Sequence, residues 1–556
     1  MKKYYLIIGI LILAAVLRLT FLDKFPAGLN ADEAAIGYNA WSLLQTGKDE
    51  HSIAWPLVFR SFDDYKLPVY FYLVLPFVKF LGLTVTAVRL PSALLGIASV
   101  LLVYLIIKLL FPPVIARSER DVAISRHLPL LSALFLALSP WHLQFSRGGW
   151  EVNAATFFIL LSLIFLLKSF EKISYLFLFG IFTALSLYTY HSARVIAPVL
   201  FIAVSAIYFA EIKKLFFKKN LKTTLMALIL SLILILPIIS QLLSKEGQSR
   251  FSGVSIFADS GPDWQATNYR LEHEDKSSLQ VRLIHNRYLS YSMRFVQNYL
   301  SHYSPDFLFL NGDAIARSKV PETGQSLLFL LPFFALGLLS LIMLDSNGKK
   351  VVLAWFLIAP LAASITYQSP HALRAENMSV PLMIIAALGT YEFFELIKKY
   401  KFVYKILIFC IFGFLSFYSF ARYLHMYYVH YPKELPYAWQ YGFDQVAAFT
   451  KENYNKYDHI IITDRYDQPY ILIAFFTKYP PADLQRDIVM SEPDHYGFAT
   501  GRKLGKYEFR TINYEQDKLL PNTLLITAEE KVDDTKVIGT VLSPAGAIMF
   551  KFLSTK

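Results

Sequence analysis

Leu29-Asn30-Ala31-Asp32-Glu33 opens, and Phe62-Asp63-Asp64-Tyr65-Lys66-Leu67-Pro68 closes, the first long polar interruption of an otherwise apolar chain. The apolar run just before this stretch is long enough to cross a bilayer. The acids and Lys66 are therefore expected at a membrane surface rather than in open water. This placement is the first indication that the stretch carries functional residues.

The composition predicts a polytopic α-helical membrane protein. Of 556 residues, 55% are apolar and 17% are charged, whereas soluble proteins carry about 25% charged residues. The formal charge of +12 could indicate nucleic-acid binding, but lysine and arginine fall in short clusters between apolar runs, as topology determinants do. We therefore expect no nucleic-acid partner. The single cysteine, Cys410, excludes an internal disulfide.

About eleven apolar runs approach or exceed the roughly 20 residues that a membrane-spanning helix needs. They cover residues 4–22, 88–111, 129–146, 152–168, 173–190, 194–210, 223–243, 326–344, 350–367, 378–397 and 403–424. The run from Leu67 to Gly82 is shorter and contains Pro76, so we expect a helix near the interface there. The first run could also be a cleaved signal peptide, but the residues after Ala14-Ala15 show no clear cleavage site.

Charge predicts the orientation, since basic loops stay in the cytoplasm. Every second connection is basic, and the richest holds Lys213, Lys214, Lys218, Lys219 and Lys222. We therefore expect a multi-pass protein of the plasma (inner) membrane with a cytoplasmic amino terminus. The outside then receives a first outer loop at 23–87, a long outer loop at 244–325, short segments at 147–151, 191–194 and 368–377, and the chain from 427 onward.

The sequence predicts a transmembrane domain at 1–426 and an extracytoplasmic α/β domain at 427–556. In the second, residues 458–463, 522–527 and 536–541 are typical of strands, and 468–477 of a helix. In the long outer loop, apolar and aromatic residues alternate with arginines from Val281 to Leu300. This pattern predicts one amphipathic helix at the outer surface.

Polar residues cluster near the outer ends of the expected spans. They are Asp32, Glu33, Asp63, Asp64, Lys66, Arg89, Arg147, Glu151, His191, Arg194, His371, Arg374 and Glu376. Charges at such depth are costly unless they pair or face water, so the set predicts a polar cavity. The alternative is that they anchor the chain at the headgroups. That alternative explains the arginines better than the acids, because carboxylates gain nothing from anionic lipids.

A carboxylate can take a proton from an attacking hydroxyl, and lysine or arginine can neutralise a departing phosphate. Together these groups suit transfer from a phosphorylated membrane donor to an acceptor arriving from outside.

The same residues resemble a known family. Asp32-Glu33, Lys66-Leu67-Pro68 (with Leu67 in place of the family's first proline) and the segment from Arg89 to Leu94, Arg-Leu-Pro-Ser-Ala-Leu, resemble motifs of GT-C fold glycosyltransferases that use polyprenyl-phosphate sugars. That group contains the protein O-mannosyltransferases and the lipid A aminoarabinose transferases. Segments 146–151, 190–194 and 370–374 resemble later outer loops of bacterial members.

The resemblance implies an inverting sugar transfer, mannosyltransferase-like, to a protein, lipid or glycan, without an obligatory metal. Asp32 would be the general base and Glu151 a second catalytic acid. Glu33 would tune Asp32 or simply face water. Donor phosphate would contact Lys66, Arg89, Arg194 and Arg374.

Further candidates for substrate binding are Asp63, Asp64, Arg147, Trp150, Tyr190, His191 and His371. No cofactor is expected. A divalent metal is possible in principle, but the histidines lack a paired spacing such as His-x-x-x-His.

Two other functions fit a polytopic chain: a transporter or lipid flippase, and a non-catalytic glycan-binding scaffold. Transporters place their sites near the membrane midplane, whereas the charges here gather at one surface.

Overall fold

The computed structural model describes residues 2–62, 64–112, 119–243, 253–493 and 499–555. The chain divides into two units. The first comprises Met1–Arg18, Leu95–Phe145 and Glu151–Tyr423, and the second Leu19–Leu94, Ser146–Trp150 and Leu424–Lys556. The expected boundary at 426/427 lies close to Leu424, but the second unit also takes in the whole first outer loop.

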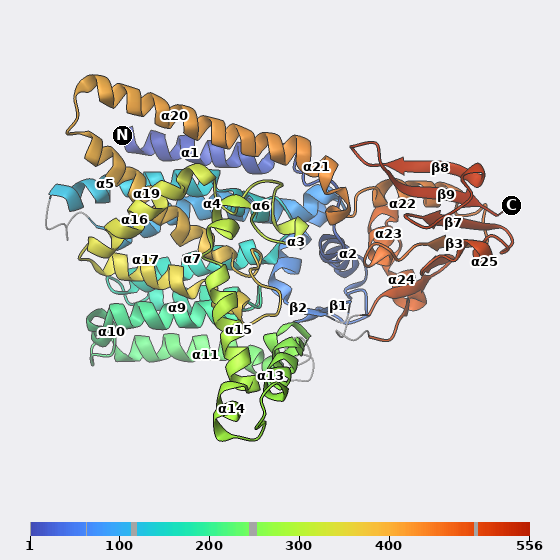
Figure 1. Cartoon of the computed structure of the whole chain (residues 1–556), viewed down its shortest axis with the longest axis horizontal. Coiled ribbons are helices and arrows are strands. Elements are labelled where there is room, and N and C mark those ends of the chain that lie inside the picture. Colours follow the sequence, from blue (N-terminus) through green and yellow to red (C-terminus); the bar gives the residue numbers. More distant parts are fainter. Residues whose placement is uncertain (1, 63, 113–118, 244–252, 494–498, 556) are drawn as a thin grey trace. The chain divides into compact units, whose positions relative to one another are not determined.

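The first unit is a bundle of helices, and its long members run in a common direction in Figure 1. Its bundle helices are α1 (Lys2–Leu19), α4 (Val85–Leu110, from Leu95 onward), α5 (Glu119–Leu138), α6 (Pro140–Ser146), α7 (Glu151–Ser169), α8 (Tyr175–Leu187), α9 (Ala193–Ile207), α10 (Phe209–Leu215), α11 (Leu221–Leu243), α16 (Leu331–Met343), α17 (Asn347–Ile358), α18 (Leu361–Ser364), α19 (Ser379–Ile397) and α20 (Phe402–His425).

Among the described residues, five helical segments are long and apolar enough to span a membrane. They are Val85–Leu110, Glu151–Ser169, Leu221–Leu243, Glu376–Ile397 and Phe402–Glu434. Two bent pairs, α5 with α6 (59°) and α9 with α10 (94°), raise the number to at most seven. The chain is thus a membrane protein by length and composition of its helices, but the expected count of eleven is not confirmed. Several predicted spans form helices too short to pass the same test.

Two glycines explain how tightly the bundle packs at one point. A Cβ on Gly337 of α16 would lie 1.9 Å from the Ile385 carbonyl oxygen, and one on Gly389 of α19 would lie 1.7 Å from that of Phe333. Only glycine permits this approach of two backbones, as is common where membrane helices pack.

The long outer loop folds into a hairpin of helices within the first unit. Its helices are α13 (Gly261–Leu271), α14 (Leu279–Ile284) and α15 (Arg287–Ser301). The single helix expected from 281 to 300 is therefore wrong. The extended backbone of Asn286 breaks it, and the side chain of Asn286 accepts a hydrogen bond from the Leu289 N–H to begin α15. An N-cap residue of this kind starts a new helix.

The second unit begins with the first outer loop. This loop forms α2 (Ala31–Thr46), a hairpin of β1 (Phe59–Ser61) and β2 (Asp64–Lys66), and α3 (Pro68–Leu81). Helix α3 corresponds to the helix expected from Leu67 to Gly82, and Pro68 at its first position suits a helix start.

The rest of the second unit is an α/β domain around a seven-stranded sheet of order β4-β5-β6-β3-β7-β9-β8. Central β3 (His459–Ile462) runs parallel to β6 (Tyr507–Phe509) and to β7 (Thr523–Thr527). The remaining strands are β4 (Val489–Met490), β5 (Gly501–Leu504), β8 (Val537–Leu542) and β9 (Ile548–Ser554), and the helices are α21 (Tyr431–Glu434), α22 (Phe443–Asn453), α23 (Pro469–Thr477), α24 (Pro481–Asp487) and α25 (Tyr514–Asp517). Strands β3, β7 and β8 and helix α23 lie where the sequence predicts them.

Candidate functional site

Helix α2 presents Asp32 and Glu33 in its first turn. The Asn30 side chain accepts a hydrogen bond from the Glu33 N–H at 3.0 Å, and the Glu33 carboxylate accepts one from the Asn30 N–H. This capping box fixes where the helix starts. Since successive residues of a helix point about 100° apart, the two acids must face different surroundings.

Glu33 faces inward and forms a buried ion pair with Arg89. The Arg89 Nε donates to Glu33 Oε1 at 2.8 Å and Nη2 donates to Oε2 at 3.0 Å, and both side chains are 0% exposed. The other guanidinium donors bind the carbonyls of Leu22, Pro26 and Gly28. All five N–H donors of Arg89 thus have protein acceptors. This geometry suits a structural pair and leaves no donor for a phosphate.

Asp32 instead meets Lys66. The Lys66 Nζ lies 2.5 Å from Asp32 Oδ1, and the side chains are 8% and 34% exposed, respectively. Lys66 ends β2, where it pairs with Phe59 of β1, and its ammonium lies 5.1 Å from the centre of the Phe62 ring. Asp64 pairs with Ser61 in the same hairpin. Asp63 lies outside the described residues.

The α/β domain holds both parts of this loop. At α2, the Gln440 side chain accepts a hydrogen bond from the Ala31 N–H at 2.6 Å. At the hairpin, the Phe62 carbonyl accepts one from the Ala499 N–H at 3.0 Å, and the Phe62 ring packs edge-on against Tyr470 of α23. The C-terminal domain therefore fixes the residues on either side of the Asp32–Lys66 pair.

A buried polar cluster joins α23 to the same loop. The Tyr470 hydroxyl donates to Glu50 Oε2 at 3.0 Å, and the Asn39 amide donates to Glu50 Oε1 at 2.8 Å. Burial raises the pKa of Glu50. Nearby, the Gln485 amide donates to Ser42, Thr46 and the Asp49 carbonyl. Sequence reasoning missed Glu50, Tyr470, Gln440 and Gln485, because nothing in their local sequence indicates a partner hundreds of residues away.

Arg147 and Trp150 are buried within the second unit. Arg147 Nε donates to the Tyr427 hydroxyl at 3.1 Å, and its guanidinium stacks on the rings of Tyr427 and Tyr428. Trp150 is 4% exposed and packs against Trp439. These side chains hold loops together in this structure. That they contact substrate stays a prediction.

The remaining candidates lie in the first unit. Glu151 begins α7 and is 8% exposed. Arg194, in the first turn of α9, donates to the Gln241 side chain at 2.6 Å and to the Leu187 carbonyl at 3.2 Å. Tyr190 and His191 lie in the turn before α9. Glu376 is buried and accepts a hydrogen bond from Thr156.

His371 and Arg374 lie in a second polar cluster of the first unit. His371 Nδ1 is 3.8 Å from Asp313 Oδ2, and the His371 N–H donates to His302 Nε2 at 3.1 Å. Burial raises the pKa of Asp313. Burial also lowers the pKa of His371 and lowers that of His302 to about 4. Among the described residues, no group of three or more His, Cys, Asp or Glu side chains is arranged to hold a metal ion.

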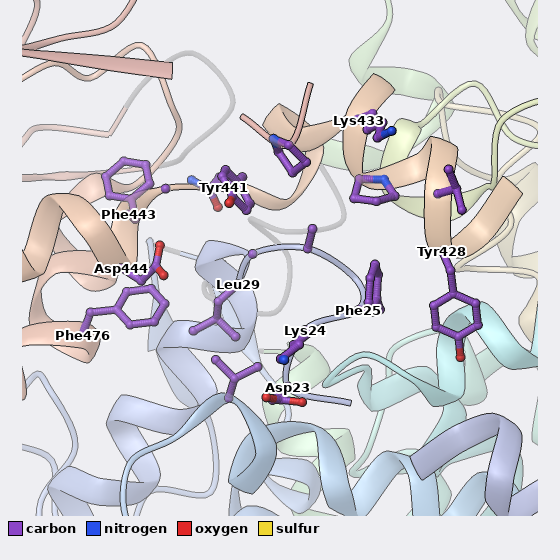
Figure 2. Close-up of a pocket in the computed structure, with 18 residues that line it drawn as sticks. Asp23, Lys24, Phe25, Leu29, Tyr428, Lys433, Tyr441, Phe443, Asp444 and Phe476 are labelled. Atoms are coloured by element: carbon purple, nitrogen blue, oxygen red, sulfur yellow. The ribbon is translucent and has the colours of Figure 1, made fainter. Parts of the chain in front are cut away.

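A cavity of about 520 Å³ lies within the second unit beside the start of α2. Figure 2 shows Phe443 and Phe476 on one side, Phe25 and Tyr428 on the other, and Leu29 between them. Gln440, which binds the Ala31 N–H, also lines the cavity. Leu29 is three residues from Asp32, so their Cα atoms are at most about 11 Å apart.

No protein-family model matches the chain, and no curated protein sequence matches it. Solved structures do match. The archaeal oligosaccharyltransferase AglB from Archaeoglobus fulgidus, in complex with an inhibitory peptide and a dolichol-phosphate, aligns with 85% of this chain at 14% identity and a TM-score of 0.51. This chain covers 64% of the length of AglB.

ArnT from Cupriavidus metallidurans in the apo state aligns with 100% of this chain and 99% of its own, at 10% identity and a TM-score of 0.51. The same protein bound to undecaprenyl phosphate aligns with a TM-score of 0.50. AglB and ArnT are GT-C fold glycosyltransferases, and this chain has the GT-C fold. The resemblance seen in the sequence motifs is thus confirmed at the level of fold.

Proposed function

We propose that the chain transfers a sugar from a polyprenyl-phosphate donor to an acceptor at the outer face of the membrane. The observation that carries the proposal is the Asp32–Lys66 contact, which joins a candidate base to a candidate phosphate ligand in a chain of this fold. Binding of lipid phosphates by AglB and ArnT supports the donor class. Mannose is the first sugar to test.

The proposed step is an inverting displacement at the anomeric carbon. The acceptor oxygen attacks that carbon, the bond from carbon to phosphate oxygen breaks, and polyprenyl phosphate leaves with the bonding electrons. The acceptor proton passes to Asp32. Lys66 neutralises charge on the leaving phosphate, which lowers the barrier to its departure.

The ion pair suggests an order of events. While Lys66 binds Asp32, it stabilises the carboxylate and weakens it as a base. A donor phosphate that takes Lys66 as its partner would release Asp32 to accept a proton. Donor binding would therefore precede acceptor activation.

The other candidate residues have different roles in the proposal. Glu33 and Arg89 support the loop rather than contact substrate. The roles of Glu151 in orienting substrate, and of Arg194 and Arg374 in binding phosphate, rest on the sequence resemblance. The proposed step uses no metal, so transfer is expected to persist in EDTA.

The test uses the purified protein with radiolabelled polyprenyl-phosphate mannose and candidate acceptors. We expect Asp32→Asn and Lys66→Ala each to lower transfer by about 10²-fold or more, because each removes a group used in the transition state. Glu452→Gln on α22 and Lys503→Ala on β5 are matched exposed controls and should transfer normally.

Transfer that is unchanged in Asp32→Asn would overturn the proposed base. If no donor supports transfer but vesicles containing the protein move lipid or solute, a transporter is the better description.

A further inference from the structure

The helical hairpin of α13, α14 and α15 has almost no core of its own. Its buried residues are Pro262 and Ala266 in α13, none in α14 and Asn298 in α15. Between α13 and α15 lies an open hollow of about 810 Å³. Helices this short do not persist in water without apolar packing, so the hairpin requires a cover.

The hairpin also exposes a dense set of large apolar side chains. They are Trp264 (69% exposed), Leu271 (56%), Leu279 (72%), Leu283 (64%), Ile284 (60%), Tyr288 (70%), Met293 (55%), Val296 (50%) and Leu300 (59%). Most are aliphatic, and aliphatic side chains suit acyl chains better than sugar rings. Isolated exposed apolar residues are ordinary, but a patch of this extent marks an interaction surface.

Within the described residues, the hairpin is fastened to the bundle at its base, where the Ile256 N–H just before α13 donates to the Ile365 carbonyl. Near the end of α15, the Asn298 amide donates to the carbonyls of Ser364 and Thr366, and the Tyr299 hydroxyl donates to that of Leu357. These acceptors lie in the last turn of α17, at the last residue of α18 and two residues beyond it. In Figure 1, α15 runs across the direction of α9, α11 and α17 rather than along it. If α11 and the bent pair α9–α10 span the bilayer, α15 lies roughly parallel to the membrane plane.

The charge of α14 and α15 agrees with a lipid partner, although the segment before them carries Asp263, Glu272, Glu274 and Asp275. Residues 279–301 contain Arg282, Arg287 and Arg294 and no acid. Arginines beside an apolar surface, with tyrosine and tryptophan, are typical of helices in the bilayer interface.

We propose that the hairpin is an interfacial anchor, with the apolar side chains of α14 and α15 among the upper acyl chains of the leaflet and its arginines among the lipid phosphates. The partner is the lipid surface itself. A second copy of the chain and a bound acceptor glycan are the alternatives that the experiment must separate.

The test uses the full-length protein in lipid vesicles. Cys410 is the only cysteine and lies exposed on α20, so Cys410→Ser gives a cysteine-free background. Leu283→Cys and, separately, Leu279→Cys then carry a fluorescent label. Neither position is buried, so both variants are expected to fold. The native Cys410, labelled in the same way, reports the signal of a spanning helix, and Lys503→Cys reports that of water.

We expect lipids brominated near the top of the acyl chain to quench the Leu283 and Leu279 labels several-fold more than the Lys503 label. Aqueous iodide should show the reverse order. Compared with the label at Cys410, both hairpin labels should be quenched more by lipids brominated near the headgroup than by lipids brominated deep in the acyl chain. The reason is that interfacial helices lie about 5–10 Å into the headgroup and acyl boundary.

Iodide quenching at Leu283 and Leu279 equal to that at Lys503, without quenching by brominated lipids, would overturn the proposal. So would protection that appears only at high protein density, which would indicate a second copy, or only with added glycan acceptor. The measurement does not use transfer activity, so its failure would leave the proposed function standing.

Discussion

At the scale of single residues, two adjacent acids have different environments because of helix periodicity. The sequence places Asp32 and Glu33 together, and their ordinary pKa values are nearly the same. The capping box at Asn30 sets the start of α2 and so turns Glu33 toward buried Arg89 and Asp32 toward Lys66. The geometry thus separates the two acids, and the role of Asp32 as the base stays a prediction.

Removing the Glu33 carboxylate should destabilise the protein. Glu33→Ala leaves the fully buried Arg89 without its counter-charge, and breaking a buried pair in this way costs about 3–5 kcal/mol. We expect a clear drop in the thermal unfolding temperature of the purified protein, larger than that of the surface variant Glu452→Gln. A Glu33→Ala protein that unfolds like the wild type would contradict the structural role assigned to the pair.

His302 should make stability depend on acidic pH. Its pKa in the folded chain is lowered to about 4 from an ordinary value of 6.5, so the folded state binds fewer protons between those values. The free energy of unfolding is therefore highest, as far as His302 is concerned, above about pH 6.5, and it decreases as the pH falls toward 4. The shift corresponds to roughly 3 kcal/mol.

His302→Gln keeps an acceptor for the His371 N–H but cannot take up a proton. Unfolding temperatures measured from pH 7 to pH 4 should therefore fall less steeply in this variant than in the wild type. Parallel slopes for the two proteins would show that His302 does not titrate as its burial implies.

At the scale of elements, the first outer loop depends on the C-terminal domain. Tyr38 of α2 donates its hydroxyl to the Tyr479 carbonyl at 2.7 Å, and the Phe475 ring of α23 lies so close to Gly37 that a Cβ there would be 2.7 Å from it. The sequence marks α2 and α23 separately but cannot reveal that they pack together. Their contact joins residues more than 400 positions apart in the chain.

Loss of the Tyr470 hydroxyl should loosen the hairpin that carries Lys66. Tyr470→Phe leaves one oxygen of buried Glu50 without its donor, a loss of about 1–3 kcal/mol. We expect faster amide exchange in residues 59–66 and several-fold weaker donor binding, with a smaller effect on the rate at saturating donor. Tyr437→Phe, at an exposed tyrosine of the same unit, is the control. Exchange in the hairpin that matches the control would show that Tyr470 does not position it.

The strands illustrate which elements a sequence can predict. β3 and β7 each contain three consecutive apolar residues, Ile460–Ile462 and Leu524–Ile526, and such runs are readable as buried strands. β6 has three residues and β4 only two, which is too short for any alternation to appear. The single helix that the sequence predicts at 281–300 is wrong for a related reason. Apolar periodicity continues across 281–300, whereas the break depends on the cap at Asn286.

At the scale of the whole molecule, the second unit constrains the number of membrane crossings. Its segments Ser146–Trp150 and Leu424–Lys556 belong to one compact unit, so we expect both on the same side of the membrane. The chain between Trp150 and Leu424 must then cross an even number of times. The helices there that pass the length test, counting α9 with α10 as one, are α7, α9, α11, α19 and α20, which is an odd number. If the bent pair α9–α10 crosses once rather than forming a re-entrant loop, we expect at least one shorter helix of the described chain to cross as well, with α8, α16 and α17 as the candidates.

Single-cysteine labelling tests this conclusion and the orientation together. In the Cys410→Ser background, we expect Asn311→Cys and Lys503→Cys to react with a membrane-impermeant maleimide in intact cells, because the charge pattern of the sequence predicts the long outer loop and the C-terminal domain to lie outside. Lys218→Cys, in the basic connection between α10 and α11, and Ser346→Cys, between α16 and α17, should react only after permeabilisation. Reaction of Ser346→Cys from outside would mean that neither α16 nor α17 crosses. In either outcome α8 has to cross with α7 and α9, because three passages bring residue 218 inside. Reaction of Lys503→Cys only after permeabilisation would place Asp32, which shares its unit, on the cytoplasmic side, and the donor would then have to be presented from that face.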